Sequence, residues 1–283
     1  MSCLLAICGR YGDIMMAVPS IQRLSHLHHG DLDLLVASKY QDVSILLGEL
    51  DVPVRRVCAE TLMCPTRDRI VTGMFMASWS EDLLRRRYLG YDKYVNAAPN
   101  MAPRGAHMMS LIAYRCGVVP SLSKLPPVQF PEPPSPDGGL VVHLGSNDPA
   151  RVVCLSEKPL DRPSTCIGLP SDPCPVWIDE DRRSDGFEDA LDALRGASAV
   201  VGSDSLFTHV SCLMGIPTLC IHTSERGYSS YFREAYPTGV SMVAERGMAD
   251  PIAVRTKLLH SSDKENSDAR SDRQMREGME LHP

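Results

Sequence analysis

The sequence predicts an α/β protein built from two domains, each organised around a mainly parallel sheet. Three observations lead to this prediction. Apolar runs of strand length alternate with amphipathic stretches of helical period through most of the chain. Six prolines and two glycines interrupt that alternation across residues 125–139. A strand, a turn, a helix and a second strand follow one another within residues 199–222, as in a parallel βαβ unit.

These features define the expected domains. We expect an N-terminal domain over residues 1–125, a proline-rich linker over 126–139, a C-terminal domain over 140–260 and a disordered polar tail over 261–283. The 283 residues contain no apolar run of membrane-spanning length, and the first residues lack the basic start of a signal peptide. A cytoplasmic location is therefore expected, with the ten scattered cysteines reduced and without a zinc site.

The N-terminal domain is expected to begin with a strand over residues 3–7, a glycine-containing loop and a helix over 14–27. The following elements are a strand, a helix and a strand, over residues 32–37, 40–47 and 52–57. A less clear helical stretch follows over 74–88, where Leu83, Leu84, Tyr88 and Leu89 share one face, and then a strand over 91–95 and a helix over 107–116. Arginines give this half an excess of positive charge, notably Arg55, Arg56 and the run 85–87. These arginines either contact phosphates or carboxylates of an anionic acceptor or belong to a solvated surface.

The C-terminal domain is expected to open with a strand over residues 140–144 that leads into a loop of small residues. Short strands over 166–169 and 176–178 and a helix over 187–197 precede the βαβ unit, and a last helix is expected over 250–259. The acidic triplet 179–181 resembles a metal motif, but it stands beside two arginines and is interpreted as a charged loop.

The turn at residues 203–206 is the main candidate binding site. Ser203 or Asp204 can cap a helix expected over 205–214, and Gly215 and Pro217 end it. The unpaired N–H groups and the positive end of the helix dipole would meet at the carboxyl edge of the sheet, where a phosphate or diphosphate binds well. The turn alone is equally compatible with an ordinary βαβ unit that binds nothing.

Two stretches resemble the signatures of glycosyltransferase family nine, the ADP-heptose:lipopolysaccharide heptosyltransferases. They are Gly12-Asp13-Ile14 with Pro19 five residues later, and the pattern Val201-Gly202-Ser203-Asp204-Ser205 followed by His209 and by Gly215-Ile216-Pro217-Thr218. The resemblance implies the GT-B architecture, in which two Rossmann-like domains face a cleft. Two family positions differ: Leu206 stands where the family has glycine, and no tryptophan follows Lys158.

The resemblance also implies residue roles. The donor diphosphate would be bound by the turn and neighbouring loops, through Ser146, Ser203, Asp204, Ser205, Leu206, His209, Thr223 and Ser224, with Lys158 or, in its place, Arg151 as the cation. Arg10, Tyr11 and Gly12 would lie on the acceptor side, and Asp13 would be the catalytic general base. Inverting transfer independently requires such a base, because the acceptor hydroxyl must lose its proton. Asp13 alternatively caps the helix that follows it.

The function expected from these features is inverting, metal-independent transfer of a sugar from a nucleotide-diphosphate sugar to a hydroxyl of an anionic acceptor. The acceptor is either a lipopolysaccharide core-like glycan, reached by peripheral membrane contact, or a nucleic acid with a modified base. No cofactor and no metal are expected. The alternative is a catalytically decayed nucleotide-binding or interaction domain. Hydrolysis by Ser203, Asp204 and His209 is disfavoured because Ser203 lacks a Gly-x-Ser-x-Gly elbow.

Overall fold

The computed structural model describes residues 1–7, 9–60, 81–97, 107–127, 137–146, 149–183, 187–224, 236, 239–244 and 247–259. This part of the chain divides into two compact units, one containing the described residues up to 127 and the other those from 137 onward. Most of the expected linker and the whole tail 261–283 lie outside the described residues. None of the described helices is both long and apolar enough to cross a lipid bilayer.

Unit 1 contains a four-stranded parallel sheet with the order β3-β2-β1-β4. Its strands are β1 (Cys3–Ala6), β2 (Leu32–Ala37), β3 (Arg56–Glu60) and β4 (Lys93–Asn96). Every residue of β1 and β2 is buried, which explains their nearly continuous apolar sequences. β3 begins four residues later than predicted, because residues 52–55 form the approach to the sheet and not the strand itself.

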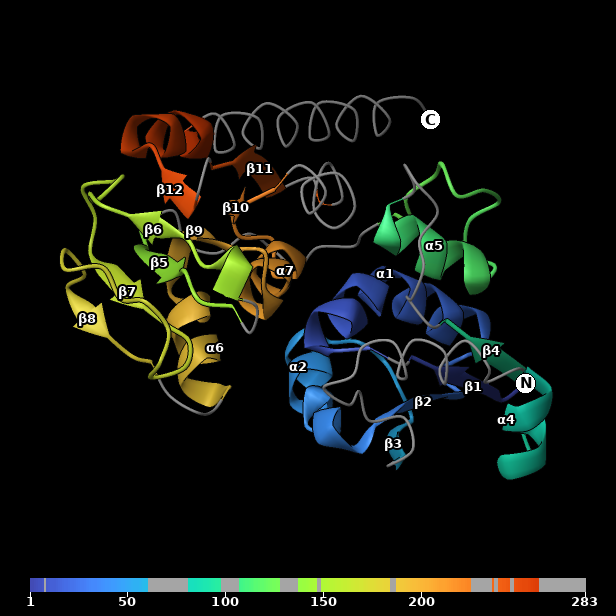
Figure 1. Ribbon diagram of the computed structural model, residues 1–283. Helices are drawn as coiled ribbons and strands as arrows, with labels where there is room; N and C mark the ends of the chain where they lie inside the picture. The colour runs from blue at the N-terminus through green and yellow to red at the C-terminus, as the bar shows by residue number, and fades with distance from the viewer. Residues whose placement is uncertain are drawn as a thin grey trace, which may run out of the picture. The chain divides into compact units, whose positions relative to one another are not determined.

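The helices of unit 1 lie between these strands in the chain, except for α5, which follows the last of them (Figure 1). They are α1 (Tyr11–Leu27), η1 (Ser38–Tyr40), α2 (Val43–Glu49), α4 (Glu81–Arg87) and α5 (Met108–Arg115). α1 starts three residues before the predicted position and continues through Pro19, and it packs against α5. Because of the earlier start, the N-cap position belongs to Arg10, and Asp13 is the third residue of the helix.

Unit 2 contains a six-stranded parallel sheet with the order β11-β10-β9-β5-β7-β8 and a small parallel pair, β12-β6. The strands are β5 (Gly139–His143), β6 (Cys154–Leu155), β7 (Ser164–Cys166), β8 (Glu180–Asp181), β9 (Ala197–Ser203), β10 (Thr218–His222), β11 (Gly239–Val243) and β12 (Met248–Ala249). The strand predicted over 176–178 is a turn, and two residues of the triplet predicted as a loop form β8.

The two faces of the unit 2 sheet carry different layers (Figure 1). Val142, Val201 and Ile221 point to a core shared with β6, β12 and the helical residues 251–259. α6 (Glu188–Arg195) and α7 (Leu206–Leu213) contact the sheet strands on the other side. Because side chains alternate along a strand, His143, Cys220 and His222 lie on the α7 face.

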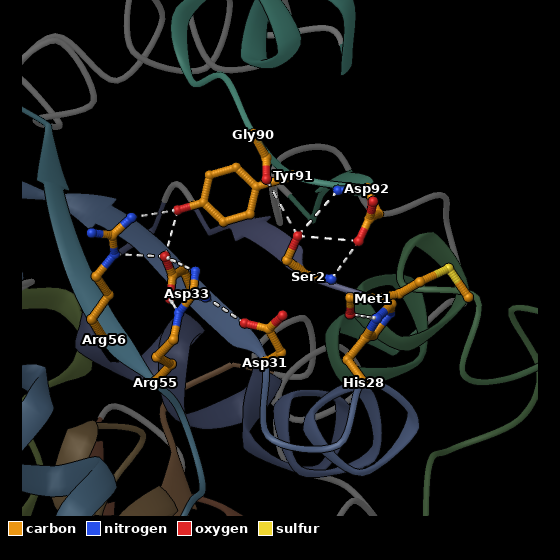
Figure 2. A network of polar contacts seen from close by, with 10 residues as sticks. All are labelled: Met1, Ser2, His28, Asp31, Asp33, Arg55, Arg56, Gly90, Tyr91 and Asp92. Carbon is orange, nitrogen blue, oxygen red and sulfur yellow. Dashed lines mark hydrogen bonds and ion pairs between the residues drawn. The ribbon is translucent and has the colours of Figure 1, made fainter.

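A buried carboxylate, Asp33, joins three strands at the amino edge of the unit 1 sheet (Figure 2). Arg55 Nε donates to Asp33 Oδ1 at 2.7 Å, Arg56 Nε donates to Oδ2 at 2.6 Å, and the Tyr91 hydroxyl also donates to Oδ2. Asp31 forms a further ion pair with Arg55. We call these five residues the Asp33 network. Both arginines are therefore paired within unit 1, although their side chains stay partly exposed.

Candidate functional site

The turn between β9 and α7 is held by local hydrogen bonds. The Ser205 amide donates to Thr208 Oγ1 at 3.2 Å, and Thr208 Oγ1 donates to the Ser203 carbonyl at 3.0 Å. Gly202 lies directly before this turn, and a Cβ there would come within 2.7 Å of the Thr208 side chain and 2.8 Å of the His143 carbonyl. Glycine is therefore required for β9 to approach both α7 and β5. These contacts fix Asp204 at the carboxyl edge of the sheet.

Asp204 is the centre of a buried polar group. Its side chain is 7% exposed, and Oδ1 lies 3.5 Å from His209 Nε2 while Oδ2 lies 3.9 Å from His222 Nδ1. Arg151 Nη1 donates to Oδ2 at 3.3 Å from the end of η3 (Pro149–Arg151). His209 Nδ1 is in turn within 2.9 Å of the Tyr236 hydroxyl. The carboxylate thus has histidine on two sides and a half-exposed arginine on a third.

The electrostatics of this group keep Asp204 ionised and His222 neutral. Burial alone would raise the pKa of Asp204, but the hydrogen bond from His209 and the nearby positive charges outweigh burial and lower it. Burial lowers the pKa of His222 to about 4, although Asp204 opposes the shift. At neutral pH the site therefore combines the Asp204 carboxylate and the neutral His222 imidazole with His209 and the Arg151 guanidinium.

A small pocket open to solvent lies over this group. It is lined by Arg151, Asp204, Ile221, His222, Thr223 and Ser224, and we call it the Asp204 pocket. The Thr223 hydroxyl donates to the Ala150 carbonyl at 2.7 Å, which holds the loop after β10 beside the residue that precedes Arg151. Four residues predicted as donor contacts, at positions 151, 204, 223 and 224, therefore come together in one place. The structure contributes Ile221 and His222 in addition.

Ser205 belongs to a separate polar chain. Its hydroxyl lies 2.8 Å from His143 Nδ1, and His143 Nε2 lies 3.3 Å from Asp172 Oδ2. Burial raises and the His143 hydrogen bond lowers the pKa of Asp172, with a net lowering. Phe207 packs edge-on against the His143 ring, 4.9 Å between centroids. These contacts fix the start of α7 relative to β5.

The other predicted donor residues are distributed differently. The Ser203 hydroxyl donates to the Gly145 carbonyl and is buried, so it joins β9 to the loop after β5. Ser146 lies in that loop, and Leu206 is the first residue of α7 and is half-buried. Lys158 donates to Asp179 at 2.6 Å, and Asp179 also accepts from the Ser164 amide at 2.9 Å. Since Ser164 begins β7, Lys158 lies at the amino edge of the sheet, opposite the Asp204 pocket.

The predicted acceptor-side residues lie at the carboxyl edge of the unit 1 sheet, after β1. Asp13 Oδ2 accepts from the Arg10 amide at 2.8 Å, so Asp13 caps the first turn of α1 from its third position. The Tyr11 hydroxyl donates to Asp42, and the Tyr11 ring packs edge-on against Tyr40. Asp13 therefore has a structural role as a cap. Its predicted role as general base stays a prediction, which an activity measurement can test.

Two further residues around Asp204 were absent from the sequence prediction, namely His222 and Tyr236. The signal for His222 is the alternation of β10, which places the side chains of Thr218, Cys220 and His222 on one face beside the helix that follows Asp204. Tyr236 is separated from His209 by 27 positions, and no local pattern connects them.

The structure is similar to solved glycosyltransferases. E. coli heptosyltransferase WaaC with ADP superposes with a TM-score of 0.60 and 12% identity over 92% of this chain and 99% of WaaC. E. coli ADP-heptose lps heptosyltransferase II has a TM-score of 0.60 and 12% identity, over 94% of this chain and 100% of that protein. A glycosyl transferase family 9 protein from Veillonella parvula has a TM-score of 0.52 and 11% identity, over 92% of this chain and 90% of that protein. No protein-family model and no curated protein matches the chain. The similarity confirms the α/β fold implied by the two signatures.

Proposed function

We propose that this protein is an inverting, metal-independent glycosyltransferase that takes its sugar from a nucleotide-diphosphate sugar. The observation that carries this proposal is the Asp204 pocket, which gathers a cation, a carboxylate and two hydroxyl side chains at the carboxyl edge of a parallel sheet. This edge is where open α/β sheets bind their ligands. The fold is that of proteins whose solved structures include a heptosyltransferase with ADP.

In the proposed donor complex, each group of the pocket has a distinct task. The Arg151 guanidinium pairs with the diphosphate and stabilises the charge that builds up on the leaving group. Thr223 and Ser224 hydroxyls and the first N–H groups of α7 donate to phosphate oxygens. Asp204 accepts hydrogen bonds from sugar hydroxyls, because a carboxylate repels phosphate and suits a hydroxyl donor.

Asp13 is proposed as the base that removes the acceptor proton. It follows the first strand of unit 1 at the carboxyl edge of the sheet, and a carboxylate is a suitable group to accept the proton of a hydroxyl. The acceptor is proposed to be anionic, as either a lipopolysaccharide core-like glycan or a nucleic acid, in the cytoplasm or at the membrane surface. No cofactor takes part in this scheme.

The first experiment is a thermal-shift screen with ADP, UDP, GDP and CDP and their sugar conjugates, with and without EDTA. A ligand at 100 times its dissociation constant stabilises the folded state by about 2.7 kcal/mol, which is readily measured. We expect nucleotides with one of the four nucleobases to stabilise the protein, both with and without EDTA. The identified nucleotide sugar is then tested for transfer to a panel of glycan and nucleic-acid acceptors.

Two variants test whether the shift comes from the Asp204 pocket. Arg151→Ala removes a charge-assisted contact worth about 1.5–3 kcal/mol, so nucleotide affinity should fall at least tenfold. Arg182→Ala is the matched control, because Arg182 is similarly exposed and pairs with one carboxylate, Glu180, away from the pocket. Equal affinities of the two variants would contradict the assigned donor site.

The alternative function is nucleotide binding without transfer, and it is favoured by Leu206. A Leu side chain at the first position of α7 limits how closely a phosphate approaches the backbone, where the resembled family has glycine. A nucleotide-dependent shift combined with no sugar transfer to any acceptor would favour this alternative. Leu206→Gly would then be expected to strengthen nucleotide binding.

A further inference from the structure

The buried side of the Asp204 pocket contains three side chains of the types that bind transition metals. Asp204 offers a carboxylate oxygen, Cys220 a sulfur and His222 an imidazole nitrogen, and these three atoms all lie within 4.8 Å of one another. All three residues are buried. We call them the three-ligand cluster. Two of its members, Asp204 and His222, also line the pocket, so the cluster is reached from solvent through it.

The backbone explains why these side chains converge. Cys220 and His222 are two residues apart on β10 and therefore point to the same face of the sheet. Asp204 follows the neighbouring strand β9 and approaches from the turn, with Oδ2 3.9 Å from His222 Nδ1. We propose that the three-ligand cluster binds a divalent cation of the Zn²⁺ class, with a fourth ligand position open to the pocket.

The distances fit such an ion after a small contraction. Zn²⁺ binds oxygen and nitrogen at about 2.0–2.2 Å and sulfur at about 2.3 Å, so tetrahedral ligand atoms are roughly 3.3–3.8 Å apart. The ligand atoms must therefore approach one another by at most about 1.5 Å. A mixed oxygen, nitrogen and sulfur donor set favours Zn²⁺, Co²⁺ or Fe²⁺ over Mg²⁺, which prefers oxygen ligands alone.

Outer contacts orient the carboxylate ligand. His209 Nε2 lies 3.5 Å from Asp204 Oδ1, the oxygen opposite His222, and His209 Nδ1 is within 2.9 Å of the Tyr236 hydroxyl. Metal-binding side chains are commonly held by such a second layer of hydrogen bonds, which fixes their direction. The Tyr236–His209–Asp204 chain supplies that layer from a different element.

Charge and protons balance on binding. The Cys220 thiol gives its proton to solvent and binds as thiolate, so binding of the divalent cation releases one proton and changes the net charge of the cluster from −1 to 0. Arg151 is the cation that competes for Asp204, at 3.3 Å from Oδ2 with a side chain 38% exposed. That distance exceeds the 2.7–2.9 Å typical of a strong ion pair, so a divalent ion at Asp204 would compete with a weakened pair.

A second group of potential ligands, Cys166, Cys174 and Asp181, fits a cation less well. Arg183 donates to both oxygens of Asp181, at 2.8 and 2.6 Å, and its side chain is only 21% exposed. A metal ion there would have to displace a half-buried guanidinium from a bidentate pair. The three-ligand cluster is therefore the favoured site, and Cys174 provides a control.

An ion in the three-ligand cluster would occupy two residues of the Asp204 pocket. It would withdraw Asp204 from sugar hydroxyls, so Zn²⁺ should inhibit the proposed sugar transfer instead of supporting it. The inference goes beyond the proposed function and does not depend on it, because the cation is measured without any nucleotide.

The experiment is a titration of the full chain with Zn²⁺ against a chromogenic chelator, and with Co²⁺ followed by absorption spectroscopy. We expect one equivalent of Zn²⁺ and a thiolate-to-Co²⁺ charge-transfer band. Cys220→Ser should abolish the band, and His222→Gln should weaken Zn²⁺ binding by more than about 100-fold, the upper range for losing an outer-layer partner. Cys174→Ser should change neither measurement.

Folding of each variant is checked by circular dichroism and thermal unfolding. If Cys220→Ser does not fold, His222→Gln and the Cys174→Ser control still test whether Zn²⁺ binds to the three-ligand cluster. Absence of stoichiometric Zn²⁺ binding in the unmodified chain would overturn the proposal. So would loss of the charge-transfer band in Cys174→Ser with retention in Cys220→Ser. Failure to find a nucleotide ligand would affect only the proposed function.

Discussion

Asp33 in unit 1 and Asp204 in unit 2 are both buried carboxylates beside parallel strands, but their surroundings differ. Asp33 is 0% exposed at the amino edge of its sheet and accepts hydrogen bonds from two arginines and a tyrosine. Asp204 lies at the carboxyl edge beside two histidines and one half-exposed arginine, below a pocket. The comparison indicates that Asp33 stabilises its unit and Asp204 is available to a ligand.

The edge of the sheet explains the difference. At the amino edge of unit 1, Arg55 and Arg56 stand at the start of β3 and reach the neighbouring strand β2, so their charges are used within the fold. At the carboxyl edge, loops leave the strands and the helices present unpaired N–H groups, which favours ligand binding. Four predictions test this contrast.

The largest effect is expected for Asp13, the carboxylate at the carboxyl edge of unit 1. Asp13→Asn keeps an oxygen that accepts from the Arg10 amide and removes the ability to take a proton. If Asp13 is the base, kcat should fall by about 10²–10⁴ with little change in thermal stability.

Asp13→Ala is the companion variant, since it also removes the cap and should cost about 1 kcal/mol of stability. An Asp13→Asn enzyme with unchanged kcat would restrict Asp13 to capping α1.

The next effect concerns the stability of unit 1. Asp33→Asn removes a buried charge that two arginines share, and the free energy of unfolding should fall by about 3 kcal/mol, at the lower end for a broken buried pair because both arginines are partly exposed. Chemical denaturation measures this change in the free energy of unfolding. Asp31→Asn removes the exposed partner of Arg55 and should cost less than about 1 kcal/mol. Equal losses would contradict the central place of Asp33.

A smaller effect on stability and a clear effect on binding are expected for Asp204→Asn. The free energy of unfolding should fall by about 1 kcal/mol, because Asn keeps an oxygen that can accept from His209 and loses only the ion pair with half-exposed Arg151. Affinity for the nucleotide sugar found in the screen should fall about tenfold, the equivalent of one charged hydrogen bond. Calorimetry with sugar and sugar-free nucleotides separates the two contributions. A stability loss as large as that of Asp33→Asn would make Asp204 a structural carboxylate.

The smallest effect is the pH dependence of the stability of unit 1. Burial raises the pKa of Asp33, but hydrogen bonds from Arg55, Tyr91 and Arg56 more than offset it, and the net pKa is lowered below 3.8. Its ion pairs therefore stabilise the fold above about pH 4, and this stability is lost as pH falls through the lowered pKa. The stability difference between the unmodified chain and Asp33→Asn should be constant near neutral pH and should narrow below about pH 4. A difference that grows in acid would contradict the assigned pKa direction.

The sequence by itself determined the elements whose signals are local. Glycine, proline and capping residues around the helix expected over 205–214 placed α7 within one residue at each end, and the apolar run of β2 gave its limits correctly. Local spacing also placed Asp204, Thr223 and Ser224 after strands of one sheet, where their side chains meet. These features depend on neighbouring residues, so the order of the chain is enough to predict them.

Only the tertiary structure decided which distant charges meet. The resemblance makes Lys158 the first candidate cation and Arg151 its substitute, but Lys158 pairs with Asp179 at the amino edge and Arg151 reaches Asp204. The partners of Asp33 and the convergence of Cys220 with Asp204 likewise depend on how strands are ordered in the sheet. Contacts between such residues arise because packing brings separate strands and loops together, and no periodicity within one segment encodes them.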